Sequence, residues 1–564
     1  MTEVARDLAG DIERSLAPPG DRSREPRGLR MIAERDLYDL GSILLLAILV
    51  ILVLTTFRGY AITNDEWIQH RYGELIIAYY RSGFADRSLF DLYNLYLYGG
   101  LFDSVAVLLG QVVSLNVYDL RHLMSAAIGV GGLGAAIATA RLIAGPRAGF
   151  LAGVALAVCG SWYGTMFHHT KDIPLAAAMA GAIYFLARTA RDLPRPQLRH
   201  VVGFGVLTGA ALGIKVLALL LVCYVPVAIA LNMRVQCIGV PRDAISFMTV
   251  SLLRFVPALL IAYVIMIVAW PWSALAPLNP IRGLISFADF GYNIRTVLDG
   301  HIYRMATVPR WYVPTYLLIK VPLLMLAGTA LALMFAAVPV LAPETASDRR
   351  RRDVALIACT AFFPLLCEAI AHGPAFCGLR HFLFVLPPVA VLTGVGLDAA
   401  ISQAATWRRP VAAGLLAVIA AGFSWNALML YRLHPYEYVF YNPLVGGLAG
   451  ASRLYATDYW ATIMPEAVDG LEGYLAKAEP VASRDPNHIY TVAFCGERAA
   501  FLRKANPHLH WAMVWQTADF FIAPTHMNCD LDSRGRVVAT VKRLGVPLGY
   551  VKDQRAMIAA RHRG

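Results

Sequence analysis

The chain has 564 residues, of which only 16% are charged, and its formal net charge is +12. Soluble domains carry about 25% charged residues, so this composition excludes an ordinary soluble protein. The positive charge does not indicate a nucleic-acid partner, because many arginines lie in short segments between long apolar runs, where they set membrane topology. We therefore expect a polytopic α-helical membrane protein that lies in a lipid bilayer.

A polar tail, residues 1–37, precedes the first apolar run. It is rich in arginine and proline and shows no hydrophobic periodicity, so we predict a disordered cytoplasmic segment. The first run, about Tyr38–Phe57, is long enough to cross about 30 Å of hydrocarbon as a helix. It lacks a small-residue cleavage site, which indicates a retained span and not a signal peptide.

The next segment, residues 58–120, is predicted to be an outer loop. Its semi-apolar part, Asn94–Val113, is placed along the membrane interface, because counting it as a span would put the basic loops on the outer side. This choice gives about 11 spans between residues 38 and 430, each near the length that a bilayer requires. The N-terminus then lies inside, "SDRRRRD" is cytoplasmic, and residues 270–312 form a second outer loop.

After residue 430 the long apolar runs stop. The pieces "IYTVAF" and "ADFFIAP" predict strands, "KRLGVPLGYV" predicts a turn, and "WATIMPEAVDGLEGYLAKA" predicts an amphipathic helix. Residues 431–564 should therefore form a small α/β domain on the periplasmic side. Cys495 and Cys529 could form a disulfide there, although the sequence leaves their separation open.

Polar side chains from several loops fall at the outer level of the membrane. A charged residue at the edge of a span is costly unless it reaches water or serves a site. The candidates are Asp65 and Glu66 in the first outer loop, Arg121 at the start of the second span, His169, Lys171 and Asp172 in a tight turn, Lys215 at a hairpin tip, His301 and Arg304 in the second outer loop, and Arg380 and His381 at a later span.

Several candidates also have a purely structural explanation. The pair Asp65–Glu66 could belong to a solvated loop, and Asp172 could stabilise the start of a helix. Lys215 could reach water from a hairpin tip, and Arg380 could anchor at lipid headgroups. His169 and its neighbouring histidine could bind a metal with Asp172, but adjacent histidines on a helix point in different directions.

One chemical function would use these residues together. A lipid phosphate is anionic and lies at headgroup depth, where arginine and lysine match its oxygens. A carboxylate nearby can take the proton from an attacking hydroxyl. A phosphate leaving group needs charge neutralisation more than a general acid, so one base is enough. Glycoside hydrolysis, in contrast, normally needs two spaced carboxyl groups.

The motifs resemble those of a known superfamily. In chain order they are "NDEW", "RHLMSAAIGV", "HHTKDIPLA", "LGIK", "WYVPTYLLIKVP", "GLRHFLFVLPP", "HPYEYVFYNPLVGG" and "TDYW". Together they resemble the GT-C glycosyltransferases, specifically bacterial relatives of the protein O-mannosyltransferases and of the lipid A aminoarabinose transferase, over about residues 38–550. Two features depart from this pattern. The His-Pro-Pro signature is replaced by "NLYLYGGL", and the second outer loop is too short for a β-trefoil insertion.

The resemblance implies an inverting hexosyl- or pentosyltransferase of the bacterial inner membrane. Its donor would be a sugar linked to a polyprenyl phosphate, and its hydroxyl acceptor a glycolipid, a polysaccharide or a protein. Asp65 would be the base, and Glu66 would orient the acceptor or the catalytic loop. The remaining candidates would bind the donor: Arg121, His169, Lys171, Asp172, Lys215, His301, Arg304, Arg380 and His381.

Two points stay open at this level. Members of the superfamily differ in metal use, so no cofactor is predicted, although a divalent metal would be compatible with the site. The alternative function is a lipid or solute transporter, or an envelope assembly protein. A transporter would favour charged residues in mid-span and two similar halves. Here the polar residues gather at one face, and no internal repeat is visible.

Overall fold

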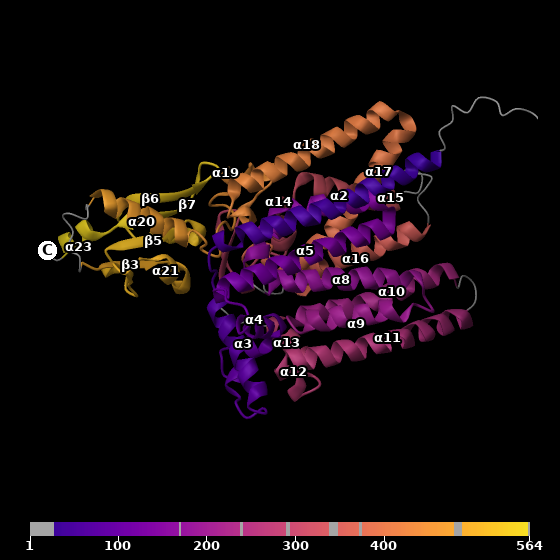
Figure 1. The fold of residues 1–564 in the computed structure, drawn as a ribbon, viewed down its shortest axis with the longest axis horizontal. Helices are drawn as coiled ribbons and strands as arrows, with labels where there is room; N and C mark the ends of the chain where they lie inside the picture. Colours follow the sequence, from indigo (N-terminus) through magenta and orange to yellow (C-terminus); the bar gives the residue numbers. More distant parts are fainter. Residues whose placement is uncertain are drawn as a thin grey trace, which may run out of the picture.

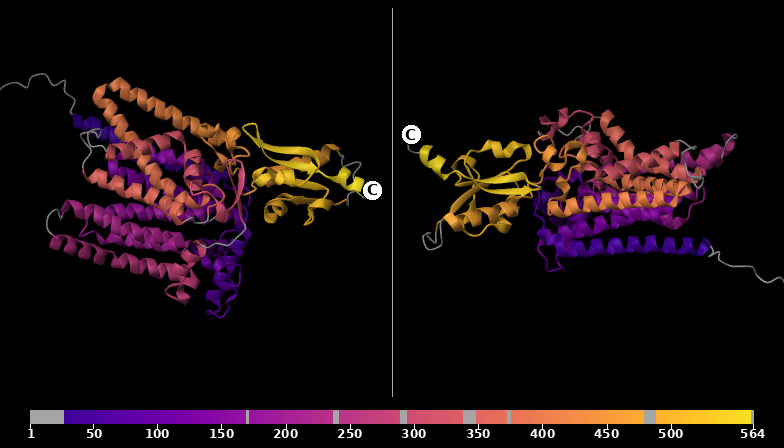
Figure 2. Two further views of the ribbon diagram at one scale, coloured as in Figure 1. Left: turned by 180° about the vertical axis from the view of Figure 1, so that it is seen from behind. Right: turned by 90° about the horizontal axis from the view of Figure 1, so that it is seen from above.

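The computed structural model describes residues 27–168, 171–236, 241–288, 294–337, 348–371, 375–478 and 488–561. A bundle of long helices makes up most of the molecule, and a smaller domain with a β-sheet lies at one end of the bundle (Figures 1 and 2). This arrangement agrees with the predicted membrane part and C-terminal α/β domain.

Eight helices among the described residues are long and apolar enough to cross a membrane. They correspond to α2 (Arg27–Thr56), α5 (Val117–Ala144), α8 (Asp172–Arg191), α10 (Leu220–Gln236), α11 (Pro241–Ala269), α16 (Asp348–Ala371), α17 (Leu386–Trp407) and α18 (Arg409–Leu433).

Two further pairs of apolar helices are each bent at a short break, and the number reaches 10 in the described residues if each pair counts as one span. Helix α6 (Pro146–Ala157) meets α7 (Gly160–Tyr163) and its 3-10 extension at 67°. Helix α14 (Tyr312–Lys320) meets α15 (Leu323–Ala337) at 112°. The break after Lys320 coincides with Pro322, which cannot continue a regular helix.

The prediction of about 11 spans counted one helix that is short. Helix α9 (Leu198–Leu212) has 15 residues, so it is about 22 Å long, less than the ~30 Å of a hydrocarbon core. It contacts α8 and α11. A Cβ at Gly205 or Gly209 would meet the backbone of α11, so these glycines allow the two helices to approach closely. The multi-pass architecture is confirmed, and only the count changes.

The predicted disordered tail, residues 1–37, lies mostly outside the described residues. Its last part is helical. Helix α2 begins at Arg27, about ten residues before the predicted first span. No proline occurs between Arg27 and Thr56, so nothing interrupts the backbone hydrogen bonds of the helix. The first outer loop therefore follows a long continuous helix.

Helix α17 is the central helix of the bundle and leads directly to the site. The most apolar 18-residue stretch of the segment Arg380–Trp407 is entirely buried. A Cβ at Gly396 would collide with the carbonyl of Gly328 in α15, and a Cβ at Gly394 would collide with α6, so glycine permits both contacts. A 3-10 turn, η8 (Arg380–Val385), precedes α17 without a gap. Arg380 is thus fixed at one end of the most buried helix.

The short elements of the two outer loops gather at the end of the bundle where α2 ends (Figure 1). The first loop contains α3 (Glu66–Arg81) and α4 (Leu101–Gly110), which pack against each other. Helix α4 has only 10 residues, so it is too short to cross a bilayer. The second loop contains α12 (Pro271–Leu275), α13 (Asn279–Ala288) and an antiparallel hairpin of β1 (Arg295–Leu298) and β2 (His301–Arg304).

The C-terminal domain contains a five-stranded sheet in the order β4-β3-β5-β7-β6. Strands β3, β4 and β5 are parallel, whereas β7 runs antiparallel to β5 and β6. Each predicted strand, turn and helix of this domain is present. The elements are α19 (Gly447–Ala451), α20 (Met464–Ala478), β3 (Tyr490–Phe494), α21 (Arg498–Lys504), β4 (Leu509–Trp511), β5 (Phe520–Pro524), α22 (Cys529–Asp532), β6 (Arg536–Arg543), β7 (Val546–Asp553) and α23 (Arg555–Arg561).

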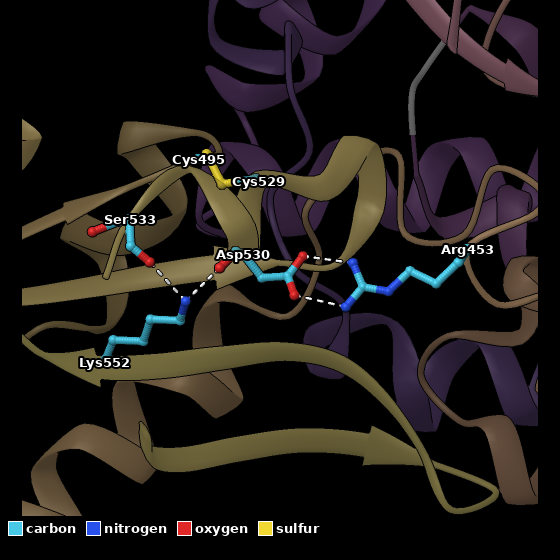
Figure 3. Close-up of a disulfide and its surroundings, with 6 residues drawn as sticks. All are labelled: Arg453, Cys495, Cys529, Asp530, Ser533 and Lys552. Carbon is cyan, nitrogen blue, oxygen red and sulfur yellow. Dashed lines mark hydrogen bonds and ion pairs between the residues drawn. A yellow bond between two sulfur atoms is a disulfide. The ribbon is translucent and has the colours of Figure 1, made fainter. Parts of the chain in front are cut away.

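Cys495 and Cys529 form a disulfide, the pairing that the sequence left open. The next residue, Asp530, accepts hydrogen bonds of 2.7 and 2.6 Å from Arg453, which lies in the segment that joins the bundle to the sheet (Figure 3). Lys552 donates to the Ser533 carbonyl at 2.8 Å. These contacts fasten α22 between the sheet and the connecting segment, so the domain has a fixed attachment.

Candidate active site

A cavity of about 410 Å³ opens at the end of the bundle where α2 ends. Side chains from both outer loops, from the turn before α8 and from η8 contribute to its wall. Its lining includes six of the residues predicted from the sequence, which are Asp65, Lys171, Asp172, Lys215, Arg380 and His381, and the aromatic residues Trp67, Tyr93, Tyr98 and Phe376. Segments more than 300 positions apart in the chain therefore form one site.

Asp172 joins two of the basic groups. Arg380 donates from Nε to Asp172 Oδ2 at 2.9 Å. Lys215 Nζ lies 3.8 Å from Asp172 Oδ1 and 3.1 Å from His381 Nδ1. All three charged side chains are buried from the surrounding solvent. Neither a headgroup anchor nor a snorkelling lysine would be enclosed in this way, so the structure favours a site over those two explanations.

Lys171 has an aromatic environment. Its Nζ lies 4.1 Å from the centroid of the Tyr98 ring and 5.7 Å from that of Tyr72. Burial lowers the pKa of Lys171 to about 8, although the nearby charges of Asp103 and Asp65 act in the opposite direction. A lysine with a pKa near 8 still carries its charge at neutral pH and would gain strongly from a bound anion.

The charges that line the cavity do not balance. Lys171, Lys215 and Arg380 supply three positive charges, whereas Asp65 and Asp172 supply two negative ones. Partly buried cations that face a cavity attract and hold an anionic group more strongly than exposed cations do. The cavity is therefore suited to bind an anionic group next to the exposed carboxylate of Asp65.

The adjacent carboxylates Asp65 and Glu66 have opposite environments. Asp65 is exposed, lines the cavity and has a left-handed backbone with φ of 72°. For a residue other than glycine this conformation costs about 1–2 kcal/mol, and such strain is typical of functional positions. Glu66 is fully buried and is not part of the cavity wall. Only the first carboxylate can meet a substrate in the cavity.

Glu66 is held by its neighbours in an ionised state. Its carboxylate accepts a hydrogen bond of 2.9 Å from the backbone N–H of Thr63 and one of 3.0 Å from His122 Nε2. Burial by itself raises the pKa of Glu66, but His122 and Thr63 outweigh it and hold the pKa below its usual value. A solvated loop would contain no such buried network, so the loop is built for a specific shape.

Besides Glu66, three predicted site residues do not line the cavity. Arg121 is fully buried and donates a hydrogen bond to Asp103 at 2.7 Å. This pairing offsets the free-energy cost of burying the guanidinium. His301 and Arg304 lie on the exposed hairpin, where the His301 ring donates to the Asp299 carbonyl at 2.9 Å. His169 lies outside the described residues.

Other residues near the site were not predicted. His122 directly follows Arg121, but its contact with Glu66 is not visible in the sequence. Trp460 comes from the C-terminal domain, and the Arg380 guanidinium lies 5.5 Å from its ring centroid. Burial raises the pKa of Glu497, and the charges of Asp65 and Glu66 raise it further. The C-terminal domain therefore borders the site at two points.

A metal site is not evident in the part of the chain that the structure describes. No group of three or more histidine, cysteine, aspartate or glutamate side chains there could hold a metal ion.

Part of the chain matches the model of a known protein family. Residues 116–272 match the family model described as dolichyl-phosphate-mannose-protein mannosyltransferase. Over these residues the chain is similar to the mannosyltransferases that the model describes. The match confirms the resemblance drawn from the motifs. It includes the elements that carry Lys171, Asp172 and Lys215, whereas Asp65 and Arg380 lie outside the matched residues.

Several solved structures are similar to this chain at low identity. ArnT from Cupriavidus metallidurans in the apo state is 14% identical, with 92% of this chain and 98% of that chain covered and a TM-score of 0.48. The same protein bound to undecaprenyl phosphate is 13% identical, with 90% and 97% covered and a TM-score of 0.47. AglB from Archaeoglobus fulgidus, an oligosaccharyltransferase in complex with an inhibitory peptide and a dolichol-phosphate, is 14% identical, with 83% and 64% covered and a TM-score of 0.44. No curated protein sequence matches the chain.

Proposed function

We propose that this protein is an inverting glycosyltransferase that moves a sugar from a polyprenyl-phosphate carrier to a hydroxyl acceptor. One observation carries the proposal: the exposed carboxylate of Asp65 shares a cavity with Lys171, Lys215 and Arg380. The name of the matching family, which contains dolichyl-phosphate-mannose, supports the same class of donor. The transferred sugar is a hexose or a pentose, and the acceptor is a glycolipid, a polysaccharide or a protein.

The proposed reaction has a single displacement step. Lys171, Lys215 and Arg380 hold the phosphate of the donor, and Asp65 takes the proton of the acceptor hydroxyl. The acceptor oxygen forms a bond to the anomeric carbon while the bond from that carbon to the phosphate oxygen breaks. The electron pair goes to the phosphate, where the three cations stabilise the charge that develops. The products are an inverted glycoside and the polyprenyl phosphate.

We infer the location from the distribution of basic residues and from the disulfide. We place the protein in a bacterial inner membrane with the N-terminus in the cytoplasm and the C-terminal domain in the periplasm. The arginine-rich loops support this orientation, since positive residues favour the cytoplasmic side. The disulfide between Cys495 and Cys529 supports it independently, because disulfides persist in oxidising compartments.

A transfer assay tests the function. The purified protein is mixed in lipid nanodiscs with undecaprenyl-phosphate mannose, glucose or arabinose, and the acceptor is a membrane extract from a strain that lacks the gene. We expect one donor to release undecaprenyl phosphate only when the extract is present, and we expect the strain to accumulate the uncleaved donor. A transporter would move the intact donor across a vesicle membrane without cleaving it, and that result would refute the proposal.

The orientation can be tested by cysteine labelling of intact spheroplasts. In a protein that retains only Cys495 and Cys529, Ala85→Cys and Gly473→Cys should react with a membrane-impermeant maleimide. Both positions are exposed at the outer end or on the C-terminal domain. Thr406→Cys, at the opposite end of α17, should react only after permeabilisation. Labelling of the Thr406→Cys variant in intact spheroplasts would reverse the topology.

The pKa of Lys171 predicts a pH dependence of donor use. Below a pKa of about 8 the ammonium group is charged, and above it the charge is lost. We therefore expect kcat/KM for the donor, which reports the free enzyme, to fall by up to about tenfold per pH unit above that value. Lys171→Arg keeps its charge at these pH values, so its profile should stay flat where the wild-type profile falls. Identical profiles would exclude Lys171 as the titrating group.

A further inference from the structure

The segment before α3 makes a tight turn at the proposed base. The Glu66 N–H donates to the Thr63 carbonyl at 3.3 Å, and the Gln69 N–H donates to the Asp65 carbonyl at 3.0 Å. Between these two bonds the backbone of Asp65 takes its left-handed conformation. An aspartate would leave this conformation if the turn were released, because a right-handed or extended backbone has less steric conflict.

The side chain of Glu66 closes this turn from inside. Its Oε1 accepts from the Thr63 backbone N–H and also from the Thr63 hydroxyl. His122 Nε2 lies 3.0 Å from one Glu66 oxygen and 3.2 Å from the other. Thr63, Glu66 and His122 are each 0% exposed. A buried carboxylate that lost its donors would carry a large desolvation penalty, so the three groups hold one another in place.

His122 itself has little freedom to move. It lies in the second turn of α5, next to Arg121, which is paired with Asp103 of α4 at 2.7 Å. One turn earlier, Asp119 accepts hydrogen bonds of 2.7 and 2.9 Å from Arg503 of α21. The start of α5 is thus fastened to the first outer loop and to the C-terminal domain. From this position His122 can impose a fixed location on Glu66.

We propose that His122 is a positioning residue for glycosyl transfer: through Glu66 and Thr63 it holds Asp65 in the left-handed conformation that directs its carboxylate into the cavity. The inference rests on the proposed function and extends it. It assigns Glu66 to the shape of the catalytic loop and not to the acceptor, which decides between the two roles that the sequence left open.

The hydrogen bonds of His122 indicate which hydrogen-bond donor a side chain at this position must provide. Nε2 must be protonated to donate to the carboxylate, whereas Nδ1 is buried and has no hydrogen-bond partner among the described residues. The contact with Glu66 therefore uses the Nε2–H of His122. A single N–H at the Nε2 position is then sufficient. The amide nitrogen of glutamine reaches that position, and that of asparagine ends one bond short of it.

This difference gives a matched pair of variants. The first measurement is the rate of hydrogen–deuterium exchange in the peptide that covers residues 61–72 of the purified protein, because exchange reports local opening. The rate should increase at least about tenfold in His122→Asn. In His122→Gln it should stay within about threefold of the wild-type rate. Turnover should fall about 30- to 100-fold in His122→Asn, with the half-saturating donor concentration within about threefold of the wild-type value, since a base that leaves hydrogen-bond reach loses most of its effect.

Matched controls separate the positioning role from a general loss of structure. His200→Asn and His200→Gln change another buried histidine near a carboxylate, at the opposite end of the bundle, and neither should alter exchange in residues 61–72. If His122→Asn does not fold, Glu66→Asp breaks the same contact from the other partner and should give the same increase in exchange.

The two measurements also separate this inference from the proposed function. Unchanged exchange and turnover in His122→Asn, or equal losses in His122→Asn and His122→Gln, would overturn the positioning role. If the wild-type protein transfers no sugar from any donor in the assay above, the proposed function fails, while the exchange experiment still shows whether His122 fixes the turn.

Discussion

Asp65→Asn is expected to lower the turnover of sugar transfer at least about 100-fold, as removal of a general base typically does. The substitution keeps the size and the hydrogen-bonding shape of the side chain but removes the proton acceptor. Asp65 is exposed in the cavity, whereas the other carboxylate of the cavity wall, Asp172, accepts a hydrogen bond from Arg380. The amide should leave the three cations in place, so the half-saturating donor concentration should change little.

Two further carboxylates serve as controls for this experiment. Glu66→Gln should cost much less, because the amide oxygen of glutamine can still accept from Thr63 and His122. Asp91→Asn changes an exposed carboxylate in the same outer loop, away from the cavity wall, and should have no effect. Turnover is measured with purified protein and a labelled polyprenyl-phosphate sugar. Wild-type turnover in Asp65→Asn would show that Asp65 is not the base.

Arg380→Ala is expected to weaken donor binding by about 2–5 kcal/mol, the usual cost of removing one partner of a buried charge pair. This corresponds to roughly 30-fold to several thousandfold in the dissociation constant. The loss has two sources. The donor phosphate loses a bidentate partner. Asp172 loses the nearer of its two cations and retains Lys215 at 3.8 Å, so a negative charge in the cavity is poorly compensated.

The two sources can be separated by a second substitution. Asp172→Asn in the Arg380→Ala background removes the repulsion and should recover part of the donor affinity. Arg380→Lys should bind the donor better than Arg380→Ala and worse than the wild type, because an ammonium group acts as a point charge. Arg310→Ala, an exposed arginine of the second outer loop, is the control. Equal donor binding in Arg380→Ala and the wild type would remove Arg380 from the site.

The sequence by itself determined the architecture. Apolar runs near 20 residues predict spans because a bilayer has a fixed thickness, and eight helices plus two broken ones agree with this in the described residues. The strand-like pieces "IYTVAF" and "ADFFIAP" predicted β3 and β5, and both strands are buried on nearly their whole length because each has a neighbouring strand on either side. The common membrane level of the polar residues predicted that separate loops share one site, and the cavity contains residues from "NDEW", "HHTKDIPLA", "LGIK" and "GLRHFLFVLPP".

Only the tertiary structure decided what each charged residue does. Asp65 and Glu66 are neighbours in the chain, yet one is exposed in a cavity and the other is enclosed by Thr63 and His122. Arg121 pairs with Asp103 and so does not reach the cavity. Hydropathy predicts how deep in the membrane a residue lies, because it reflects the free energy of transferring the residue from water to lipid. The direction of its side chain and its partner depend on contacts between distant segments, such as Arg380 with Asp172, and no local pattern encodes those contacts.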